Sequence, residues 1–199
     1  MITRKEMTRM LLKEGLLSCL ANNSFESVTV TSLCKASGIT RSTFYLHYSN
    51  IMEIVDDLVD DAIAYSKPGM VDNNNLQTIA NTLSAASNSV SLREAYDSIF
   101  DRLPLCQRII RHKKYLPLFL DEQISEYVLQ RIIGREKDRQ GLVIAESLGV
   151  LFDVGVSVFV FLVHGLYAVN KQYKWSQSDE WLEAQKIIFE LVYRGLQSR

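Results

Sequence analysis

A run of polar and aromatic residues from Thr29 to Tyr48 has the clearest chemical pattern in the sequence. It reads as two short helices separated by Gly38, because glycine adopts a left-handed backbone at the least cost. Thr29 is the predicted N-cap of the first helix and Thr40 of the second. The second helix opens with Arg41 and two hydroxyl residues. In a helix-turn-helix, this is the position that meets base edges and phosphates.

Apolar residues in the same run supply the packing that two such helices need. The expected buried face of the first helix carries Val30, Leu33 and Cys34. Ile39 is expected to fill the angle between the helices. Phe44 and Tyr48 are four residues apart, so they share one face of the second helix and should anchor it to a core.

The run resembles the amino-terminal domain of the TetR-type transcriptional regulators. In that family a threonine and an apolar residue open a helix that ends in Ala-Gly, and the next helix ends in Tyr-x-His-Phe. The matching positions are Thr29-Val30, Ser37-Gly38 and Tyr45-Leu46-His47-Tyr48. The similarity in motifs covers about residues 2–63, and beyond them only the length and the all-helical pattern agree.

This resemblance implies an all-α fold of about nine helices, with a three-helix helix-turn-helix domain and a larger ligand-binding and dimerisation domain. It also implies a homodimer that binds an inverted-repeat operator in double-stranded DNA. A repressor released by a small-molecule effector is favoured over an activator, because most of the family represses. The residues expected at base edges are Arg41, Ser42 and Thr43. Those expected at phosphates are Thr29, Thr40, Tyr45 and His47. For Tyr45 and His47 the alternative is a packing role within the head.

Ile51 departs from the family pattern, which commonly places a lysine here, at the start of the fourth helix, to contact a phosphate. Isoleucine cannot make that contact. This change and a small basic excess favour an alternative function. The chain would then be a TetR-shaped adaptor that binds DNA weakly and acts through a protein partner.

Charge is unevenly distributed, although the 199 residues carry a net charge of only −1. Residues 1–50 hold six basic and three acidic side chains, whereas residues 51–67 hold one lysine and five acidic side chains. A basic head before an acidic helix suits a domain that presents one face to DNA. The acidic stripe consists of Glu53, Asp56, Asp57, Asp60 and Asp61. No histidine accompanies it, so a solvated face is expected rather than a metal site.

The chain is expected to divide into a helix-turn-helix domain (1–50), a connecting helix (51–67) and a helical effector-binding and dimerisation domain (68–199). The break near residue 68 is marked by proline, glycine and three asparagines. Later helices are predicted at about 76–88, 91–103 and 117–135. A basic cluster at 108–114 is interpreted as a solvated face or part of an effector mouth, and the alternative is a second DNA contact.

Aromatic residues of the second half are candidates for the walls of an effector pocket, although aromatics at helical spacing more often form core. The candidates are Tyr96, Phe100, Tyr115, Phe119, Tyr127 and Phe152. His164, alone on an apolar face, is expected to be a core histidine rather than a sensor.

From Leu148 to Val169 only Asp153 and His164 carry side chains that ionise near neutral pH. A run of this length is compatible with a transmembrane helix, a buried core helix or an obligate dimer interface. The resemblance favours the dimer, because family members pair through their last two helices, and no membrane association is expected. The predicted interface residues are Val156, Phe159, Val163, Trp181, Ile188, Phe189 and Val192.

Other classes of function find little support in the residues. An enzyme needs convergent acid, base or nucleophile groups, and three scattered histidines without a glycine-rich phosphate loop do not supply them. Three distant cysteines have no metal-ligand spacing, so neither a metal nor a cofactor is predicted. Lys13 and Glu14 interrupt the first apolar run, which argues against a signal peptide and for a cytoplasmic protein.

Overall fold

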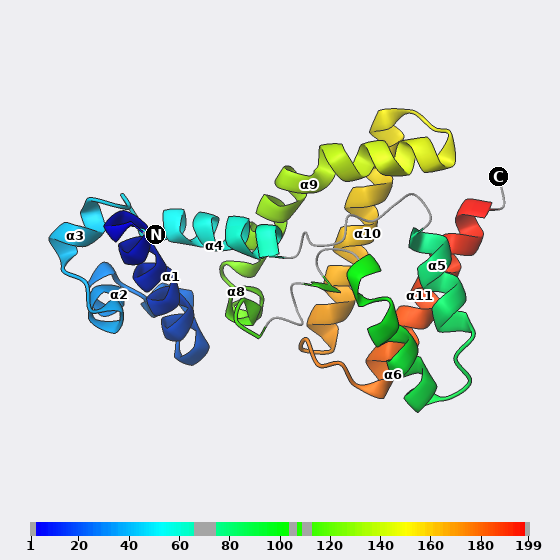
Figure 1. The fold of residues 1–199 in the computed structure, drawn as a ribbon, viewed down its shortest axis with the longest axis horizontal. Coiled ribbons are helices and arrows are strands. Elements are labelled where there is room, and N and C mark those ends of the chain that lie inside the picture. The colour runs from blue at the N-terminus through cyan, green and yellow to red at the C-terminus, as the bar shows by residue number, and fades with distance from the viewer. Residues whose placement is uncertain (1–2, 66–74, 104–106, 109–112, 198–199) are drawn as a thin grey trace. The chain divides into compact units, whose positions relative to one another are not determined.

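The computed structural model describes residues 3–65, 75–103, 107–108 and 113–197 (Figure 1). These residues form ten α-helices and two 3-10 helices with no strand among them, so the predicted all-α class is confirmed. The helices of the first half are α1 (Arg4–Asn22), η1 (Phe25–Ser27), α2 (Val30–Ser37), α3 (Arg41–Tyr45), α4 (Ile51–Tyr65), α5 (Asn75–Ser84) and α6 (Ser89–Ser98). Those of the second half are η2 (Phe100–Arg102), α8 (Leu116–Leu120), α9 (Ser125–Leu148), α10 (Phe152–Gln172) and α11 (Asp179–Gln197).

The chain divides into two units, but not by a single cut along the sequence. The first unit comprises Met1–Tyr65 and Ile109–Gly134, and the second comprises Ser66–Arg108 and Arg135–Arg199. The predicted boundary near residue 68 lies outside the described residues. The segment that contains α8 was expected in the second domain. It groups instead with the amino-terminal helices, because α8 packs against α1.

Helix α1 is the centre of the first unit and packs against α2, α4 and α8. It begins with a capping box, in which Thr3 Oγ1 accepts the Glu6 N–H at 3.2 Å and the Glu6 carboxylate accepts the Thr3 N–H at 2.7 Å. Leu12, on its buried face, is 0% exposed. At Gly15 an added Cβ would lie 2.0 Å from Ser37 Oγ and 3.1 Å from Ser37 Cβ. A side chain at residue 15 would therefore force Ser37 to shift where α1 approaches α2.

The helix predicted from Pro117 to about Arg135 is two helices, α8 and α9. Asp121 separates them with an extended backbone, and its Oδ1 accepts the N–H groups of Gln123 and Ile124 at 3.0 and 3.2 Å. This is the role of an N-cap, so the carboxylate starts a new helix. Apolar residues continue at helical spacing on both sides, which is why periodicity alone does not reveal the break.

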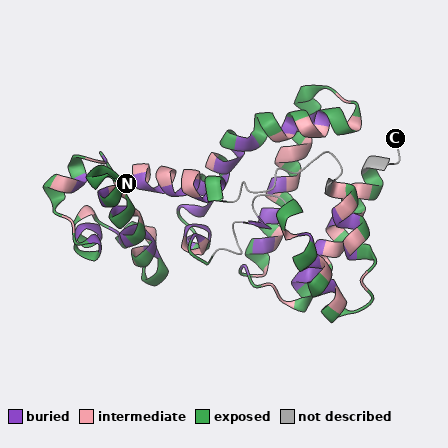
Figure 2. Cartoon of the chain, in the orientation of Figure 1, coloured by how far each residue is buried: buried purple, intermediate pink, exposed green. Residues whose placement is uncertain are grey.

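Figure 2 colours the chain by burial, and buried, intermediate and exposed positions alternate along its helices. The second unit is built around Trp181, which is 1% exposed. Its ring meets the Tyr96 ring edge-on with centroids 5.2 Å apart, and its Nε1 donates to Asn170 Oδ1 at 2.8 Å. Gln107 donates to the buried Gln185 at 3.1 Å and accepts from the Tyr96 hydroxyl at 3.2 Å. The apolar core around them consists of Ile79, Leu83, Leu92, Ile99, Leu103, Leu166, Leu182 and Phe189. A chain of polar groups therefore runs through an apolar core.

The apolar segment from Leu148 onward contains a helix boundary. Helix α9 ends at Leu148, Gly149 adopts a left-handed φ of 62°, and α10 begins at Phe152. The two helices approach so closely that a Cβ on Gly155 would lie 2.2 Å from the Gly141 carbonyl oxygen. Among the described residues, α10 alone has the length and composition of a membrane-spanning helix, with a mean hydropathy of 1.9 over its most apolar window.

Candidate nucleic-acid interface

Helix α2 begins at a reciprocal cap. Thr29 Oγ1 accepts the Ser32 N–H at 3.1 Å, and Ser32 Oγ accepts the Thr29 N–H at 2.9 Å. The cap satisfies two of the backbone donors that a helix start leaves unpaired. The predicted N-cap is confirmed, and the Thr29 residue remains exposed.

The turn between α2 and α3 has the predicted geometry. Gly38 adopts φ 65° and ψ 25°, the left-handed conformation that glycine reaches without steric cost. Ile39 is partly buried, and Thr40 then caps α3 by accepting the Thr43 N–H at 3.2 Å. The backbone therefore enters α3 with Arg41 as its first residue.

Helix α3 and the turn after it have one buried and one open face. Phe44 is 0% exposed and Tyr48 is 3% exposed, so the predicted aromatic anchor is confirmed. Arg41 and Ser42 are exposed, and Thr43 is partly exposed. A helix fixed on its aromatic side and open on its polar side has the arrangement needed to enter a nucleic-acid groove.

The two aromatic candidates for phosphate contacts differ in exposure. Tyr45 is 53% exposed, and its ring meets the Phe44 ring edge-on with centroids 5.1 Å apart. His47 is partly buried, and its Nδ1 is inaccessible and has no hydrogen-bond partner within the described part of the chain. Any contact between His47 and a ligand must therefore use Nε2.

Leu46 is the residue of this segment that the sequence prediction missed. It is 81% exposed, the largest value among the exposed large apolar side chains of the described residues. The signal lay in the spacing, because a residue two positions after Phe44 lies about 200° around the helix from that anchor. An apolar side chain therefore stands on the open face.

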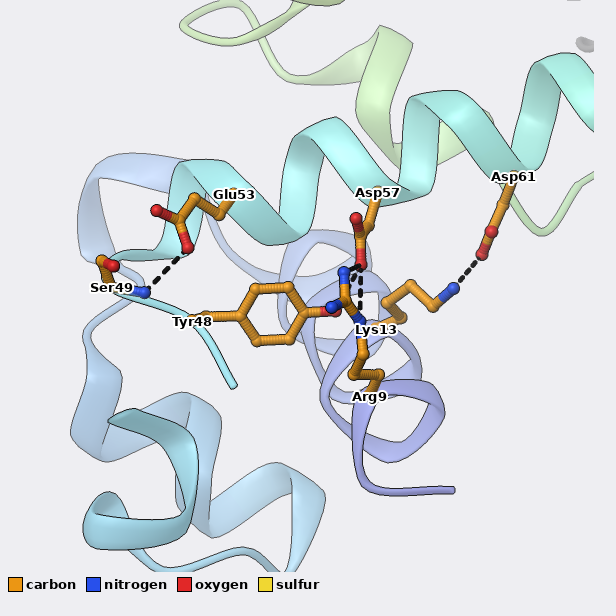
Figure 3. Close-up of polar contacts among 7 residues, drawn as sticks. All are labelled: Arg9, Lys13, Tyr48, Ser49, Glu53, Asp57 and Asp61. Atoms are coloured by element: carbon orange, nitrogen blue, oxygen red, sulfur yellow. Dashed lines mark hydrogen bonds and ion pairs between the residues drawn. The ribbon is translucent and has the colours of Figure 1, made fainter. Parts of the chain in front are cut away.

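Acidic residues of α4 connect the turn that follows α3 to α1 (Figure 3). Asp57 Oδ2 accepts the Tyr48 hydroxyl at 2.6 Å and Arg9 Nε at 3.1 Å. The Arg9 guanidinium also lies over the Tyr48 ring, 4.8 Å from its centroid. Burial and the hydrogen bond to Asp57 raise the pKa of Tyr48, so its hydroxyl stays protonated and donates. The same carboxylate raises the pKa of Arg9.

Lys13 forms a second ion pair between α1 and α4, with Asp61 (Figure 3). Arg9 and Lys13 are one helical turn apart, as are Asp57 and Asp61, so the two pairs repeat along both helices. Two of the six basic residues counted for the head therefore serve its internal structure. The other four are exposed, and they are Arg4, Lys5, Lys35 and Arg41.

The solvated acidic face expected on α4 is wrong in its main point, because most of the stripe is a contact surface. Asp56 accepts the Tyr127 hydroxyl at 2.6 Å and pairs with Arg131 at 3.2 Å. Glu53 accepts the Ser49 N–H at 2.8 Å. Among the described residues, no group of three or more histidine, cysteine, aspartate or glutamate side chains is placed to hold a metal ion.

Residues after 113 add bonds to the head. Lys114 Nζ pairs with Glu14 of α1 at 2.5 Å, so this member of the predicted basic cluster has a structural partner. Asp121 Oδ2 accepts the Phe25 N–H of η1 at 2.6 Å, while the other oxygen caps α9. Residues 109–112 of the basic cluster lie outside the described part of the chain.

A groove of about 600 Å³ opens beside α3 and the start of α4. Its lining consists of Phe25, Glu26, Val28, Val30, Tyr45, Ser49, Asn50, Ile51, Met52 and Gln123. Ile51 occupies the position where the family pattern has a lysine. The surface beside Tyr45 is accordingly apolar rather than basic at that point.

The six residues predicted for an effector pocket are divided between the two units. The first unit holds Tyr115, Phe119 and Tyr127, and the second holds Tyr96, Phe100 and Phe152. Tyr96, Tyr115 and Phe119 are 2%, 6% and 2% exposed and belong to the cores. Tyr127 and Phe152 are 39% and 43% exposed. The core interpretation therefore fits three of the six.

The predicted dimer interface also divides. Its members are Val156, Phe159, Val163, Trp181, Ile188, Phe189 and Val192. Val163, Trp181 and Phe189 are 5%, 1% and 2% exposed within the chain itself, so we correct their place from interface to core. Val156 packs against Gly141 of the same chain. Among the side chains that the structure describes, the exposed large apolar ones of α10 and α11 are Phe152, Val154, Phe161, Ile187 and Leu191.

No model of a known protein family matches the chain, and a search of curated proteins finds no match either. The resemblance to TetR-type regulators therefore depends on the residues of the amino-terminal head. The local geometry of that head is the part of the molecule on which a functional proposal must stand.

Proposed function

We propose that this protein is a TetR-type DNA-binding transcriptional regulator that acts in the cytoplasm as a homodimer. The observation that carries the proposal is α3, whose first residues Arg41 and Ser42 are exposed while Phe44 is fully buried. The left-handed turn at Gly38 and the Thr40 cap, which set the start of α3, support the same function. Neither catalysis nor a cofactor is part of the proposal.

Each contact residue has a role that follows from its chemistry. Arg41 offers a planar pair of donors that matches O6 and N7 of guanine in the major groove. Ser42 and Thr43 bond to base edges or nearby phosphates through their hydroxyls. Tyr45 donates its exposed hydroxyl to a phosphate, and His47 does so through Nε2. Phosphate contacts set the position on the duplex, whereas Arg41 contributes sequence preference.

A second copy of the chain is proposed to cover α10 and α11. Phe161 is 72% exposed and Leu191 is 66% exposed, and only 22% of the apolar window of α10 is buried. Such surface is costly in water and is removed when two copies pair. A two-fold dimer places its recognition helices about 34–36 Å apart on the duplex, so the operator is an inverted repeat.

A small-molecule effector is proposed to bind the second unit and to act through different affinities for two arrangements of the dimer. The buried side chains of Asn170 and Gln185 support a polar ligand there. Each has one amide nitrogen without a hydrogen-bond partner among the described residues, and such donors are normally satisfied by a ligand or water.

The test is selection of bound duplexes from a random DNA pool by the purified protein. We expect an inverted repeat to be recovered. Arg41→Ala should relax preference at one position of each half-site, whereas Lys137→Ala, which removes an exposed charge from the second unit, should not. Random sequence recovered by a folded dimer contradicts the proposal.

The groove beside Ile51 favours one second candidate, the TetR-shaped adaptor that acts through a protein partner. On that hypothesis the groove accepts an apolar side chain of the partner, and DNA affinity is weak. Ile51→Lys separates the two functions. It should leave regulator function intact or improve DNA affinity, whereas it should abolish adaptor function by placing a charge in the groove.

A further inference from the structure

Leu46 is the most exposed large apolar side chain of the described residues, at 81%. Its backbone is helical, with φ −73° and ψ −18°, and its N–H bonds to the Ser42 carbonyl oxygen at 3.3 Å. The helical path of α3 therefore continues through Leu46. This places Leu46 one turn beyond Ser42 and on the same face.

The neighbours of Leu46 on the open face are hydroxyl residues. Ser42 and Thr43 lie within about 60° of it around the helix, and Phe44 lies on the opposite side. A leucine on a polar, solvated face contributes nothing to the core, which Phe44 and Tyr48 complete without it. What the side chain offers is an isobutyl group next to donors and acceptors that suit base edges.

Major-groove edges of the four base pairs present donors, acceptors and a single apolar group, the C5 methyl of thymine. We propose that Leu46 contacts this methyl group and selects thymine at one position of each half-site, beside the base read from Ser42. The inference rests on the proposed function, because it requires α3 to lie in the major groove.

The size of the effect follows from the area of one methyl group. Burying one such group between protein and DNA strengthens binding about fourfold, and a symmetric operator contains the contact twice. Loss of both methyl groups is therefore expected to weaken binding about fifteenfold. A single half-site change should show the fourfold step.

The experiment replaces each thymine of the selected operator by uracil, which removes only the C5 methyl. Affinities are measured by fluorescence anisotropy for the wild-type protein, Leu46→Ala and Tyr45→Phe. At one symmetric pair of positions we expect uracil to weaken wild-type binding about fifteenfold. Leu46→Ala should bind the thymine operator with that same loss and be insensitive to uracil. Tyr45→Phe should bind more weakly but keep full sensitivity to uracil.

Two outcomes overturn the inference in different ways. If an inverted repeat is selected but no thymine shows a methyl effect that Leu46→Ala abolishes, the thymine contact is refuted and the DNA-binding function stands. If the folded protein selects no operator, both are refuted. Circular dichroism checks that Leu46→Ala is folded. Because Leu46 is exposed, we expect this variant to keep its structure.

Discussion

Two tyrosines three residues apart, Tyr45 and Tyr48, are expected to have opposite roles, and removing each hydroxyl separates them. Tyr48→Phe should lower the stability of the fold without changing contacts to DNA. Tyr45→Phe should leave stability unchanged and weaken binding to all DNA sequences alike. Both changes remove one oxygen atom, so each variant is the control for the other.

The magnitudes follow from the surroundings of the two hydroxyls. Tyr48 is 3% exposed and donates to the Asp57 carboxylate at 2.6 Å. Hydrogen bonds to charged groups contribute roughly 1.5–3 kcal/mol. Asp57 keeps Arg9 as a partner and its side chain is 26% exposed, so the lower end applies. We expect about 1.5 kcal/mol for Tyr48→Phe and less than about 0.5 kcal/mol for the exposed Tyr45.

Urea unfolding followed by far-UV circular dichroism measures the stability of both variants, and fluorescence anisotropy measures their affinity for specific and random duplexes. The expected loss for Tyr48→Phe corresponds to about a tenfold change in the unfolding equilibrium constant. Equal unfolding midpoints for Tyr48→Phe and the wild type would refute a stabilising role for the hydrogen bond between the Tyr48 hydroxyl and Asp57. A stability loss in Tyr45→Phe would show that the Tyr45 hydroxyl stabilises the fold, contrary to the role assigned to it.

Four further predictions address other parts of the structure. Gly15→Ala should cost about 2 kcal/mol by thermal melting, because its Cβ meets Ser37, and Ser37→Ala should restore part of that loss. The pKa of Tyr48 is raised in the fold, so the stabilisation from its hydroxyl should be complete below about pH 10 and decline at higher pH. The difference in urea midpoint between wild type and Tyr48→Phe should therefore be constant up to about pH 10 and smaller at about pH 11. Asp121→Ala should lower stability by about 2 kcal/mol in urea unfolding, because the α9 cap and the bond to η1 are both lost. Phe161→Glu should give a monomer in sedimentation velocity with unchanged helix content, and a persistent dimer would place the interface elsewhere.

Residue types along the sequence are sufficient to predict the local structure of the amino-terminal head. The caps at Thr29 and Thr40 and the left-handed Gly38 depend on bonds and steric limits within three or four residues, so residue types alone predict them. The burial of Phe44 and Tyr48 followed from their helical spacing for the same reason. The all-α class follows from the same local periodicity, repeated along the chain.

The exposure of Leu46 can also be predicted from helical spacing, because the spacing places Leu46 opposite Phe44 on the helix. The residue types expected at base edges and phosphates are polar, and this criterion does not select a leucine near the end of the helix. The break at Asp121 was harder to foresee. A carboxylate at an N-cap looks like any surface aspartate until its distant partner Phe25 is in place.

Contacts between distant segments show which charged groups already have partners within the fold. Arg9 and Lys13 are 48 residues from the carboxylates that bind them. A count of charges along the sequence therefore includes both in the basic excess of the head. The sequence also could not predict which face of α10 remains exposed, because a helix apolar on all sides has no periodicity that marks one side as core. Local rules specify a helix and its ends, whereas contacts between distant segments determine which of its residues remain available for a partner.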